Sequence, residues 1–491
     1  MQFNSFQYII YLSGVTVLYY LLGLRARKFL LLAASFAFYA AWNAKYLLLM
    51  LAVIGVTYAA ACGMVKYPGR KKPIFAVCLA SVLALLFYFK YLNFVIETVN
   101  ALFRSHFALW QILLPVGISF YVFQSLGYVI DVWHDPGACE KSLLNYALFI
   151  SFFPQLVAGP IERSSNMLAQ FNTLQKFRIE NIKNGLTLIL IGLVEKVVIA
   201  DRLAVFVSGV FDGYQNAGRL TLALAVVFFA FQVYCDFGAY SLIAIGSARL
   251  MGYRLMQNFN HPYLSRSFGE YWSRWHISLS SWFQDYIFTP FVWANPLKRL
   301  GRQFAKPPMR IGLLLVFFVS GLWHGANWTF VVWGLLHAGF RIVEATTLKA
   351  RKRFYKKHPR QKDAGWLALA EVLSVFVLNC VTYVFFRADS LGHAAAYLRQ
   401  IFVGTSAEIL PVEAFGLARG ELILSVLLIA GLLLCDITGE RRHKNCSADE
   451  IIEQKPVIAQ GAIYAGLLLL LVVCGTYGAN YVENPFIYFQ F

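Results

Sequence analysis

The stretch that decides the fold is IGLLLVFFVSGLWHGANWTFVVWGLLHAGF, residues 311–340. It contains no Asp, Glu, Lys or Arg, but His324 lies near its centre. A helix that crosses a bilayer needs about 20 consecutive apolar residues. A histidine at membrane depth is costly, which indicates a functional site, and its proton affinity suits proton transfer near neutral pH. We therefore expect His324 to lie at the centre of a site inside the membrane.

The composition of the whole chain also indicates a membrane protein. Of its 491 residues, 59% are hydrophobic and 14% are charged, and its mean hydropathy is +0.59. A soluble protein carries about a quarter charged residues. Residues 1–24 have no basic residue ahead of their apolar stretch, which predicts a first membrane helix rather than a cleaved signal peptide. The expected fold class is an all-α polytopic membrane protein.

Apolar runs of near-spanning length recur along the sequence, and they predict about 11–13 membrane helices, with interfacial and re-entrant helices in addition. The runs are residues 7–23, 29–43, 46–65, 73–97, 110–133, 143–158, 184–200, 220–247, 311–345, 366–386, 421–438 and 456–477. We find no long repeat and no soluble domain. The chain is expected to form a single integral-membrane domain, 1–491, with N-terminal helices (1–133), a core (134–345) and C-terminal helices (346–491).

Charge gives the predicted orientation. The net charge is +18, from 43 basic and 25 acidic residues, and 16% of the chain is aromatic. The basic residues cluster between apolar runs, which is typical of cytoplasmic loops and argues against a nucleic-acid partner. The clusters are 25–28, 66–72, 298–310, 349–362 and 441–444. With all of them in the cytoplasm, the N-terminus and the tail ending at Phe491 are both expected outside.

The positions of the basic clusters also constrain the stretch around His324. Basic clusters flank it on both sides, so residues 311–345 should cross the membrane an even number of times. About 35 residues are too few for two full spans at a rise of 1.5 Å per residue. We expect a pair of short helices, or a broken helix that turns at Gly325, Ala326 and Asn327. Irregular backbone at this depth must be buried or line a cavity, which predicts a cavity around His324.

A second histidine lies in a polar, aromatic segment, residues 268–286. One interpretation is a functional segment around His276. The other is an interfacial re-entrant helix in which Arg274 extends its charge to the surface. No carboxylate lies near His324 in the sequence, which argues against a Ser-His-Asp triad and favours a general base for a hydroxyl or thiol. Asn327 is expected either to orient the ring of His324 or to cap a helix at the break.

Other polar residues in apolar surroundings are further candidates. Asp236 needs a partner, an arginine or a cluster of hydroxyls. Glu195 and Lys196 are expected to neutralise each other. His337 is either a core histidine with satisfied hydrogen bonds, the favoured interpretation, or a catalytic residue. Arg163 is either a phosphate-binding group for a cofactor or an ordinary cytoplasmic arginine.

Two segments predict surface helices, and the cysteines predict no metal site. Residues 166–184 mix aromatic and aliphatic side chains with polar ones, as an interfacial amphipathic helix does, and residues 391–402 are similar on the outer side. Six of the eight cysteines lie in apolar runs, and none has a metal-ligand spacing. Neither a disulfide framework nor a bound metal is expected.

Taken together, the motifs resemble those of the membrane-bound O-acyltransferase family. The resemblance is to its bacterial branch that modifies polysaccharides, which includes alginate O-acetylases, peptidoglycan O-acetylation proteins and teichoic-acid D-alanyl transferases. The matching motifs are LPVGISFY (114–121), AGP (158–160), YCDF (234–237), RWHISLS (274–280), GLWHGANW (321–328), FRA (386–388) and NPFIYFQF (484–491). The two histidine motifs, in this order, are the most specific part of the match.

The resemblance implies a ring of membrane helices around a central tunnel. It makes His324 the catalytic histidine and His276 an assisting one. Beside what the resemblance implies, we expect supporting roles for Trp323, Asn327, Arg274 and Asp236, and a donor-binding role for Arg163. The implied donor is acetyl-CoA or another cytoplasmic acyl thioester, with no permanently bound cofactor.

The implied acceptor is an extracytoplasmic polysaccharide, reached through an SGNH-type partner transferase at the bacterial inner membrane. Two alternatives remain open. One is a D-alanyl transferase that uses a phosphopantetheine carrier protein and teichoic acid. The other is a secondary transporter with broken helices at the midplane, although the sequence has neither internal repeats nor intramembrane carboxylate pairs.

Overall fold

The computed structural model describes residues 3–300, 308–357, 365–404, 412–442, 446–477 and 486–487. The described residues form helices and no strand, as expected where apolar segments must satisfy their own backbone hydrogen bonds. Most of the C-terminal motif 484–491, the tail end at Phe491, and parts of the basic clusters at 298–310, 349–362 and 441–444 lie outside the described residues.

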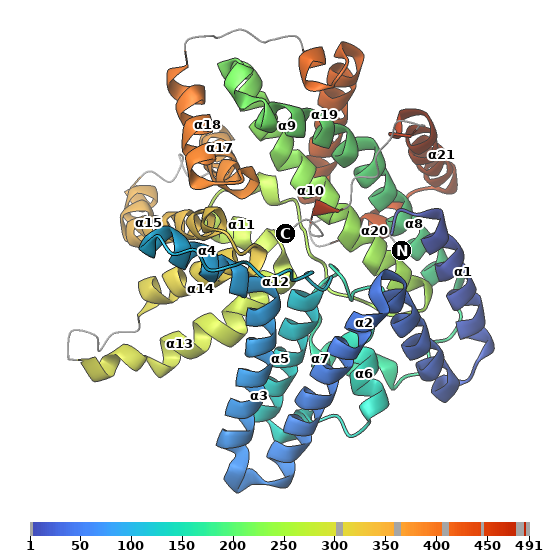
Figure 1. Ribbon diagram of the computed structural model, residues 1–491. Coiled ribbons are helices and arrows are strands. Elements are labelled where there is room, and N and C mark those ends of the chain that lie inside the picture. The colour runs from blue at the N-terminus through green and yellow to red at the C-terminus, as the bar shows by residue number, and fades with distance from the viewer. Residues whose placement is uncertain are drawn as a thin grey trace. The chain divides into compact units, whose positions relative to one another are not determined.

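Helices of very different length make up the structure (Figure 1). The α-helices are α1 (Phe6–Leu21), α2 (Leu24–Lys66), α3 (Lys71–Leu86), α4 (Leu92–Phe103), α5 (Ile118–His134), α6 (Leu143–Ser151), α7 (Ser164–Phe171), α8 (Ile179–Leu193), α9 (Asp201–Asp212), α10 (Arg219–Leu250), α11 (Phe268–Arg274), α12 (Ile277–Phe283), α13 (Thr289–Ala294), α14 (Met309–His324), α15 (Trp328–Lys357), α17 (Gly365–Arg387), α18 (Leu391–Val403), α19 (Arg419–Arg442), α20 (Ala448–Glu453) and α21 (Val457–Cys474). Short π-helical segments are η2 (Phe87–Tyr91), η4 (Val194–Ala200) and η7 (Gln284–Phe288), and 3₁₀ turns are η1 (Pro68–Arg70), η3 (Pro136–Ala138), η5 (Tyr214–Asn216), η6 (Pro262–Leu264), η8 (Pro296–Leu300) and η10 (Val412–Phe415).

Within the described residues, six helical segments are long and apolar enough to cross a membrane: Leu24–Lys66, Pro68–Phe103, Arg219–Leu250, Gly365–Arg387, Arg419–Arg441 and Val457–Cys474. Phe6–Leu21 and Met309–His324 are shorter apolar helices. The predicted number, 11–13, counted apolar runs, and several of these runs are joined, shortened or interrupted in the structure. The all-α polytopic fold class is confirmed.

The chain forms two compact units, and each is described by itself. The first unit contains residues 1–190 and 240–257. In it, α2 packs against α3, α5 and α6, as Figure 1 shows. The predicted runs 29–43 and 46–65 form one long helix, α2, with a kink at Asn43, whose φ of −160° and ψ of 110° are not helical. The break therefore lies where the sequence placed it.

Two predicted elements of the first unit are wrong in extent. The run 143–158 forms a helix only over Leu143–Ser151, because Pro154 follows and the residue before a proline avoids helical backbone. The run 166–184 is not one amphipathic helix, since α7 ends at Phe171 and α8 begins at Ile179. Asn172, directly after α7, accepts hydrogen bonds from Lys28 Nζ (2.7 Å) and Asn145 Nδ2 (3.0 Å), which anchor the start of the connection to α8.

The second unit contains residues 191–239 and 258–491, and the decisive stretch forms a helical hairpin in it. α14 ends at His324, Gly325–Asn327 form the turn, and α15 begins at Trp328. The backbone of Gly321 lies against Phe330, and that of Gly334 against Phe317, so the two helices are antiparallel. The predicted break at 325–327 is confirmed. α14 has 16 residues, or about 24 Å at the helical rise, which is shorter than a full span.

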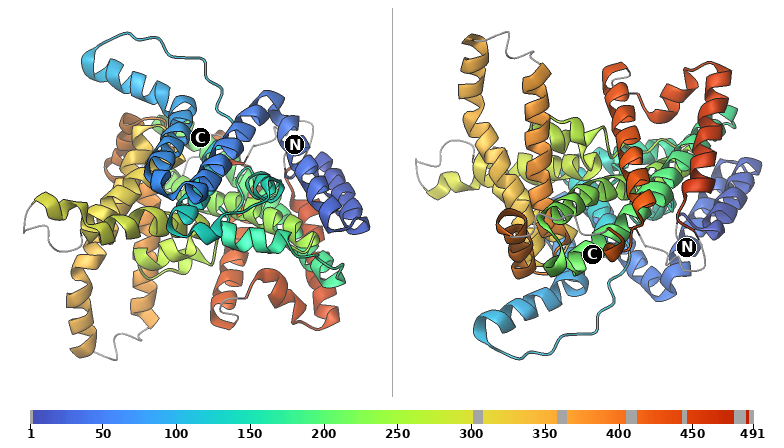
Figure 2. Two further views of the ribbon diagram at one scale, coloured as in Figure 1. Left: turned by 90° about the horizontal axis from the view of Figure 1, so that it is seen from below. Right: turned by 90° about the horizontal axis from the view of Figure 1, so that it is seen from above.

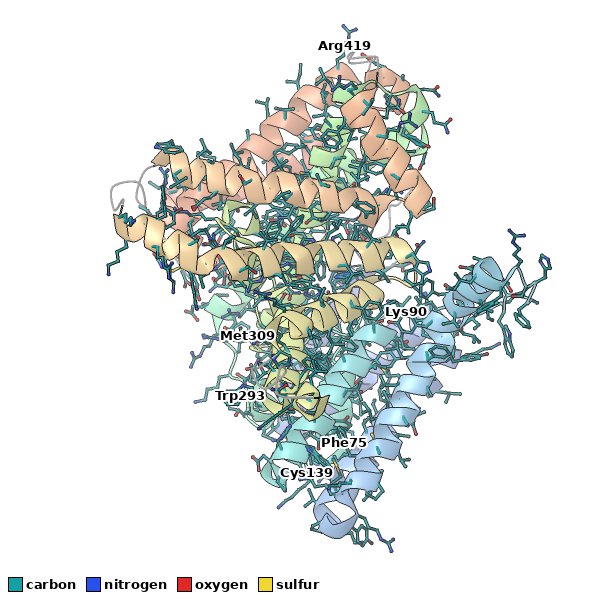
Figure 3. All side chains as sticks on the ribbon, turned by 90° about the vertical axis from the view of Figure 1, so that its left-hand side faces the viewer. Phe75, Lys90, Cys139, Trp293, Met309 and Arg419 are labelled. Carbon is teal, nitrogen blue, oxygen red and sulfur yellow. The ribbon has the colours of Figure 1, made fainter. Side chains whose placement is uncertain are left out.

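Several other helices of the second unit pack around this hairpin. α15 packs against α11 and α17, and α17 packs against α18. The two long helices α15 and α17 run side by side in the right-hand view of Figure 2 and in Figure 3, where Met309 marks the start of α14 and Arg419 that of α19. The segment 391–402 is helical, as predicted, and Ser390 caps α18 by accepting the N–H of His393 (3.1 Å).

Candidate active site

His324 is buried at the end of α14. Its side chain is 5% exposed, and its ring lies 4.9 Å from that of Trp333 on α15 and 5.5 Å from that of Phe386 on α17. Three helices therefore enclose the imidazole. The helix stops here because glycine and asparagine in the following turn are poor helix formers.

His276 is held in an unusual backbone conformation between α11 and α12. Its φ of +43° and ψ of +54° are left-handed, which is uncommon outside glycine and clusters at functional sites. Neighbouring backbone bonds hold it there: Ile277 N donates to Asn258 O (2.9 Å), and Asn260 N donates to Arg274 O (3.0 Å). The side chain is fully buried, and burial lowers the pKa of the imidazole to about 3. His276 is therefore neutral at physiological pH.

Trp323 brings the two histidines together. Its ring centroid lies 5.7 Å from His276 and 5.0 Å from His324, and it meets both rings edge to face. Phe237 of α10 closes the other side of His276 at 4.6 Å. Although 48 residues separate the histidines in sequence, the fold places them on one tryptophan.

Asn327 forms hydrogen bonds that fix the turn after His324. Its Oδ1 accepts the N–H of Thr329 (3.0 Å), which is a helix-capping bond for α15, and its Nδ2 donates to the carbonyl of Asp389 (3.0 Å). The capping interpretation of Asn327 thus matches its geometry. The second bond ties the turn to the chain that follows α17.

His337 extends the row of rings. It lies one turn after Trp333, with ring centroids 4.9 Å apart, and its Nε2 is 3.2 Å from the hydroxyl of Thr382. This contact agrees with the interpretation as a core histidine. Trp333, which the sequence did not single out, is the residue that joins His324 to His337, and its only signal was its position nine residues after His324.

Arg274 is ion-paired. It forms a two-pronged contact with Glu440 of α19 (2.8 and 2.9 Å) and a bond with Glu270 (2.7 Å), and its side chain is 12% exposed. The prediction that Arg274 extends its charge to the surface is wrong, because two carboxylates meet it. Arg274 holds the segment that carries His276.

Asp236 has a lysine as its partner, not an arginine or hydroxyl cluster. Lys196 Nζ lies 2.6 Å from Asp236 Oδ1 and 2.8 Å from Asp201 Oδ1. The expected pairing of Glu195 with Lys196 is wrong, since the ammonium points to these two carboxylates. The backbone N–H of Ile487 donates to the other oxygen of Asp236 (2.7 Å), and Phe486 lies 4.4 Å from the ammonium. A lysine inside the apolar run 184–200 was the signal for this cluster.

Arg163 lies in the first unit, as the residue that precedes α7. Its neighbour Glu162 is the more deeply buried group, which the sequence did not single out. Glu162 accepts hydrogen bonds from the backbone N–H of Met256 and from Asn166 Nδ2. Burial raises the pKa of the Glu162 carboxyl to about 7.

Two cavities lie along the hairpin, on either side of His324 in sequence. The stem pocket, about 370 Å³, is lined by Gly269, Trp272, Ser273, Ile277, Leu279, Ser280, Ser281, Phe283, Gln284, Phe288, Leu313, Val316, Phe317, Ser320 and Arg341. The turn pocket, about 350 Å³, is lined by Lys196, Asp201, Ala204, Ser208, Phe229, Gln232, Asp236, Asn327, Thr329, Phe330, Phe386, Arg387, Ala388, Asp389 and Ile487.

Their order along the hairpin follows from their lining residues. The stem pocket uses α14 up to Ser320 and α15 at Arg341, whereas the turn pocket uses Asn327, Thr329 and Phe330. His324 lies between them in the antiparallel pair. In the part of the chain that the structure describes, no three His, Cys, Asp or Glu side chains converge as a metal site requires. The arrangement suits acid–base chemistry between two separate cavities.

Sequence comparison supplies the family. A model of the membrane-bound O-acyltransferase family matches residues 34–386. The chain belongs to this family. The resemblance inferred from its motifs is confirmed, and this member of the family is a multi-pass membrane O-acyltransferase rather than a secondary transporter.

The chain is similar in sequence to several named acyltransferases. A probable alginate O-acetylase of Pseudomonas putida is 34% identical over 496 residues, which cover 96% of each chain. A peptidoglycan O-acetyltransferase of Helicobacter pylori is 33% identical over 76% of this chain and 73% of its own. A teichoic acid D-alanyltransferase of Bacillus subtilis is 26% identical over 57% of this chain and 70% of its own.

Proposed function

We propose that this chain transfers an acetyl group from a cytoplasmic thioester, acetyl-CoA or a close analogue, to a hydroxyl on the opposite side of a bacterial inner membrane. The observation that carries the proposal is that His324 and His276 both lie against Trp323, and that His324 lies between two separate pockets. Acetyl is favoured over D-alanyl because the relatives named O-acetylases are more similar, at 34% and 33% identity against 26%.

In the proposed reaction, His324 is the general base. Its imidazole takes the proton of the acceptor hydroxyl while the oxygen attacks the thioester carbonyl. A C–O bond forms, the C–S bond breaks, and the proton passes from the imidazole to the leaving thiolate. His276 acts as the neutral partner that orients the carbonyl and stabilises the charge that develops on it.

The proposed direction follows from charge. The ends of α14 and α15 distant from the turn carry Arg310 and the basic residues of 349–357, which the positive-inside rule assigns to the cytoplasm. The stem pocket lies toward these ends, and its largely apolar lining with Arg341 suits the arm of an acyl thioester. The turn pocket then serves the acceptor. Arg163 lies in the first unit, and its donor-binding role stays a prediction.

The proposed setting includes a partner. The acceptor is an extracytoplasmic polysaccharide, reached through an SGNH-type transferase, and both termini of the chain lie outside. The chain and its partner would act together at the surface of the lipid bilayer. No bound cofactor is required, because the thioester is a substrate.

The central experiment is the His324→Ala variant, assayed with radiolabelled acetyl-CoA in nanodiscs. We expect thioester consumption and product formation to fall by about 10³-fold or more, since the base is lost while binding is kept. Folding is checked by size-exclusion profile and thermal unfolding. Acylation at the wild-type level in a folded His324→Ala protein would contradict the mechanism. Mass spectrometry of the product decides between acetyl and D-alanyl.

A further inference from the structure

We propose that residues 92–113 form a membrane-surface anchor, which inserts its apolar side chains among the lipid acyl chains at the edge of the bilayer. We call this segment the α4 arm. It consists of α4 and of the chain that returns from α4 toward α5. The inference concerns the first unit alone, and it does not depend on the proposed acyl transfer.

The chain has crossed the bilayer before the α4 arm begins. α3 and η2 together cover residues 71–91, or about 30 Å at the helical rise, which equals the thickness of the hydrocarbon core. The basic cluster 66–72 lies at one end of this stretch. At the other end η2 reads FYFKY, and aromatic rings beside a lysine are typical of the interface between lipid and water. The α4 arm therefore begins at the bilayer surface opposite the basic cluster.

The direction of the chain changes at this interface. η2 is π-helical, and insertions of this kind bend helices. α4 turns away from α3 there, as seen in Figure 1 and in Figure 3, where Lys90 marks η2. α4 is thus not a simple extension of the membrane-crossing helix.

The outside of the α4 arm is apolar, although the arm lies past the hydrocarbon core. No residue of α4 is buried. Large apolar side chains are exposed on both the helix and the returning chain: Val95, Leu102, Phe103, Phe107, Leu109, Trp110 and Leu113. The only titratable side chains between residues 92 and 113 are those of Glu97, Arg104 and His106. Such a surface is unfavourable in water, and it suits the boundary between headgroups and acyl chains.

Two asparagines of α4 bind the backbone of the returning chain. Asn93 Nδ2 donates to the carbonyl of Trp110 (2.8 Å), and Asn93 Oδ1 accepts the N–H of the same residue (3.0 Å). Asn100 binds the carbonyl and the N–H of Phe107 in the same way, both at 2.9 Å. Because the two asparagines are seven residues apart, they lie on one face of α4.

These hydrogen bonds indicate a lipid environment rather than an aqueous one. Water would satisfy the N–H and C=O groups of an exposed loop, whereas next to lipid the chain itself must satisfy them. A third bond of this kind runs from the Tyr46 hydroxyl of α2 to the carbonyl of Leu113 (2.8 Å). The turn is made at Arg104, whose φ is +52°. The backbone polar groups of the returning chain are thus paired where its apolar side chains are exposed.

The surroundings of the α4 arm favour lipid over a protein partner. Exposed apolar side chains continue from α3 and η2 into the arm, as Val77, Leu83 and Phe87 show. Docking surfaces for proteins have a polar rim around an apolar centre, and no such rim separates the arm from the lipid-facing side of α3. The lipid-facing surface of the first unit therefore extends over the α4 arm.

The test is photocrosslinking of the full chain in bacterial membranes, with benzoylphenylalanine in place of Phe103, Phe107 or Trp110. We expect phospholipid adducts, measured by mass spectrometry, at a yield about fivefold or more above that of the same probe at Asp389, whose side chain is 80% exposed. A probe at Val472, which is exposed on the candidate membrane span α21, gives the yield for full lipid contact. Adducts mainly with another protein or with a second copy of the chain would overturn the inference. Yields no higher than at Asp389 would also overturn it.

The lipid composition tests which part of the lipid is bound. Glu97 and Arg104 carry opposite charges, so adding phosphatidylglycerol to phosphatidylcholine nanodiscs should leave the adduct yield at Phe107 unchanged. A yield that rises severalfold with phosphatidylglycerol would show recognition of headgroup charge and contradict insertion among the acyl chains.

The Asn100→Leu variant tests the asparagine contacts. Leucine is similar in size to asparagine but cannot bind the backbone of Phe107. We expect the phospholipid adduct at Phe107 to fall about fivefold, because the unpaired peptide groups favour water over lipid. The matched control is Asn181→Leu, a partly exposed asparagine of α8 in the same unit, which should leave the yield unchanged. An unchanged yield in Asn100→Leu, or an equal fall in Asn181→Leu, would overturn the proposed anchor, and the yield at Val472 checks membrane insertion of each variant.

Discussion

Glu162 lies in the short stretch before α7. It is buried, and it accepts hydrogen bonds from Met256 and Asn166. Burial raises the pKa of its carboxyl from 4.5 to about 7. Because the folded-state pKa lies above the unfolded one, its contribution to stability is full below pH 4.5 and is lost as the pH rises through 7.

The Glu162→Gln variant should remove this dependence. Glutamine keeps an acceptor oxygen for the Met256 N–H and carries no charge at any pH. Relative to the variant, we expect the wild type to lose at most about 3 kcal/mol between pH 4.5 and 8. Thermal unfolding in detergent across this range measures the difference. Glu180→Gln, an exposed glutamate of the same unit, is the control; parallel curves for wild type and Glu162→Gln would contradict the assignment.

At the scale of elements, two carboxylates of α19 bind the segment that carries His276. Asp436 and Glu440, one turn apart on this helix, bind His261 (2.8 Å) and Arg274 (2.8 and 2.9 Å) respectively. His261 and Arg274 lie at the two ends of the loop closed by the bond from Asn260 N to Arg274 O. The left-handed conformation of His276, two residues further on, is thereby held from outside the loop.

Weakening the ion pair between Arg274 and Glu440 should affect catalysis more than donor binding. In Glu440→Gln we expect kcat to fall about tenfold with little change in the KM for the thioester, because a mispositioned group of the site costs rate. Exchanging the charges in the double variant Arg274→Glu/Glu440→Arg should restore part of the rate.

The matched control is Arg266→Gln, which breaks the ion pair of Arg266 with Glu371 (2.7 Å) in the same segment. If Arg266→Gln loses as much kcat as Glu440→Gln, the effect is one of general stability and the positioning role is wrong.

At the scale of the molecule, the features fixed by local chemistry were predictable. The kink between runs 29–43 and 46–65 and the break at 325–327 follow from apolar length, charge and poor helix formers. The partners of His276 and Asp236 were not predictable, because contacts between residues 40 or more positions apart depend on how the helices pack. Segment 166–184 was wrongly predicted as one helix, and the contacts of Asn172 with Lys28 and Asn145, which lie on other helices, were not predictable either.

The orientation of the second unit is open to direct measurement. If the turn faces outward, a cysteine in Asp389→Cys should react with a membrane-impermeant maleimide in intact cells. A cysteine in Lys356→Cys, in the basic part of α15, should react only after the inner membrane is permeabilised. The unmodified chain, with its eight cysteines, gives the background. The reverse pattern would place the turn in the cytoplasm and invert the proposed route.

The burial of both histidines behind aromatic rings has a consequence for the cell. His276 is fully buried and His324 is 5% exposed, so the surrounding side chains shield both imidazoles from water. A protein that joined the two aqueous compartments here would leak protons and dissipate the membrane's electrochemical gradient. In the proposed reaction, the tryptophan and phenylalanine rings around the imidazoles would limit such a proton leak while an acetyl group crosses the membrane.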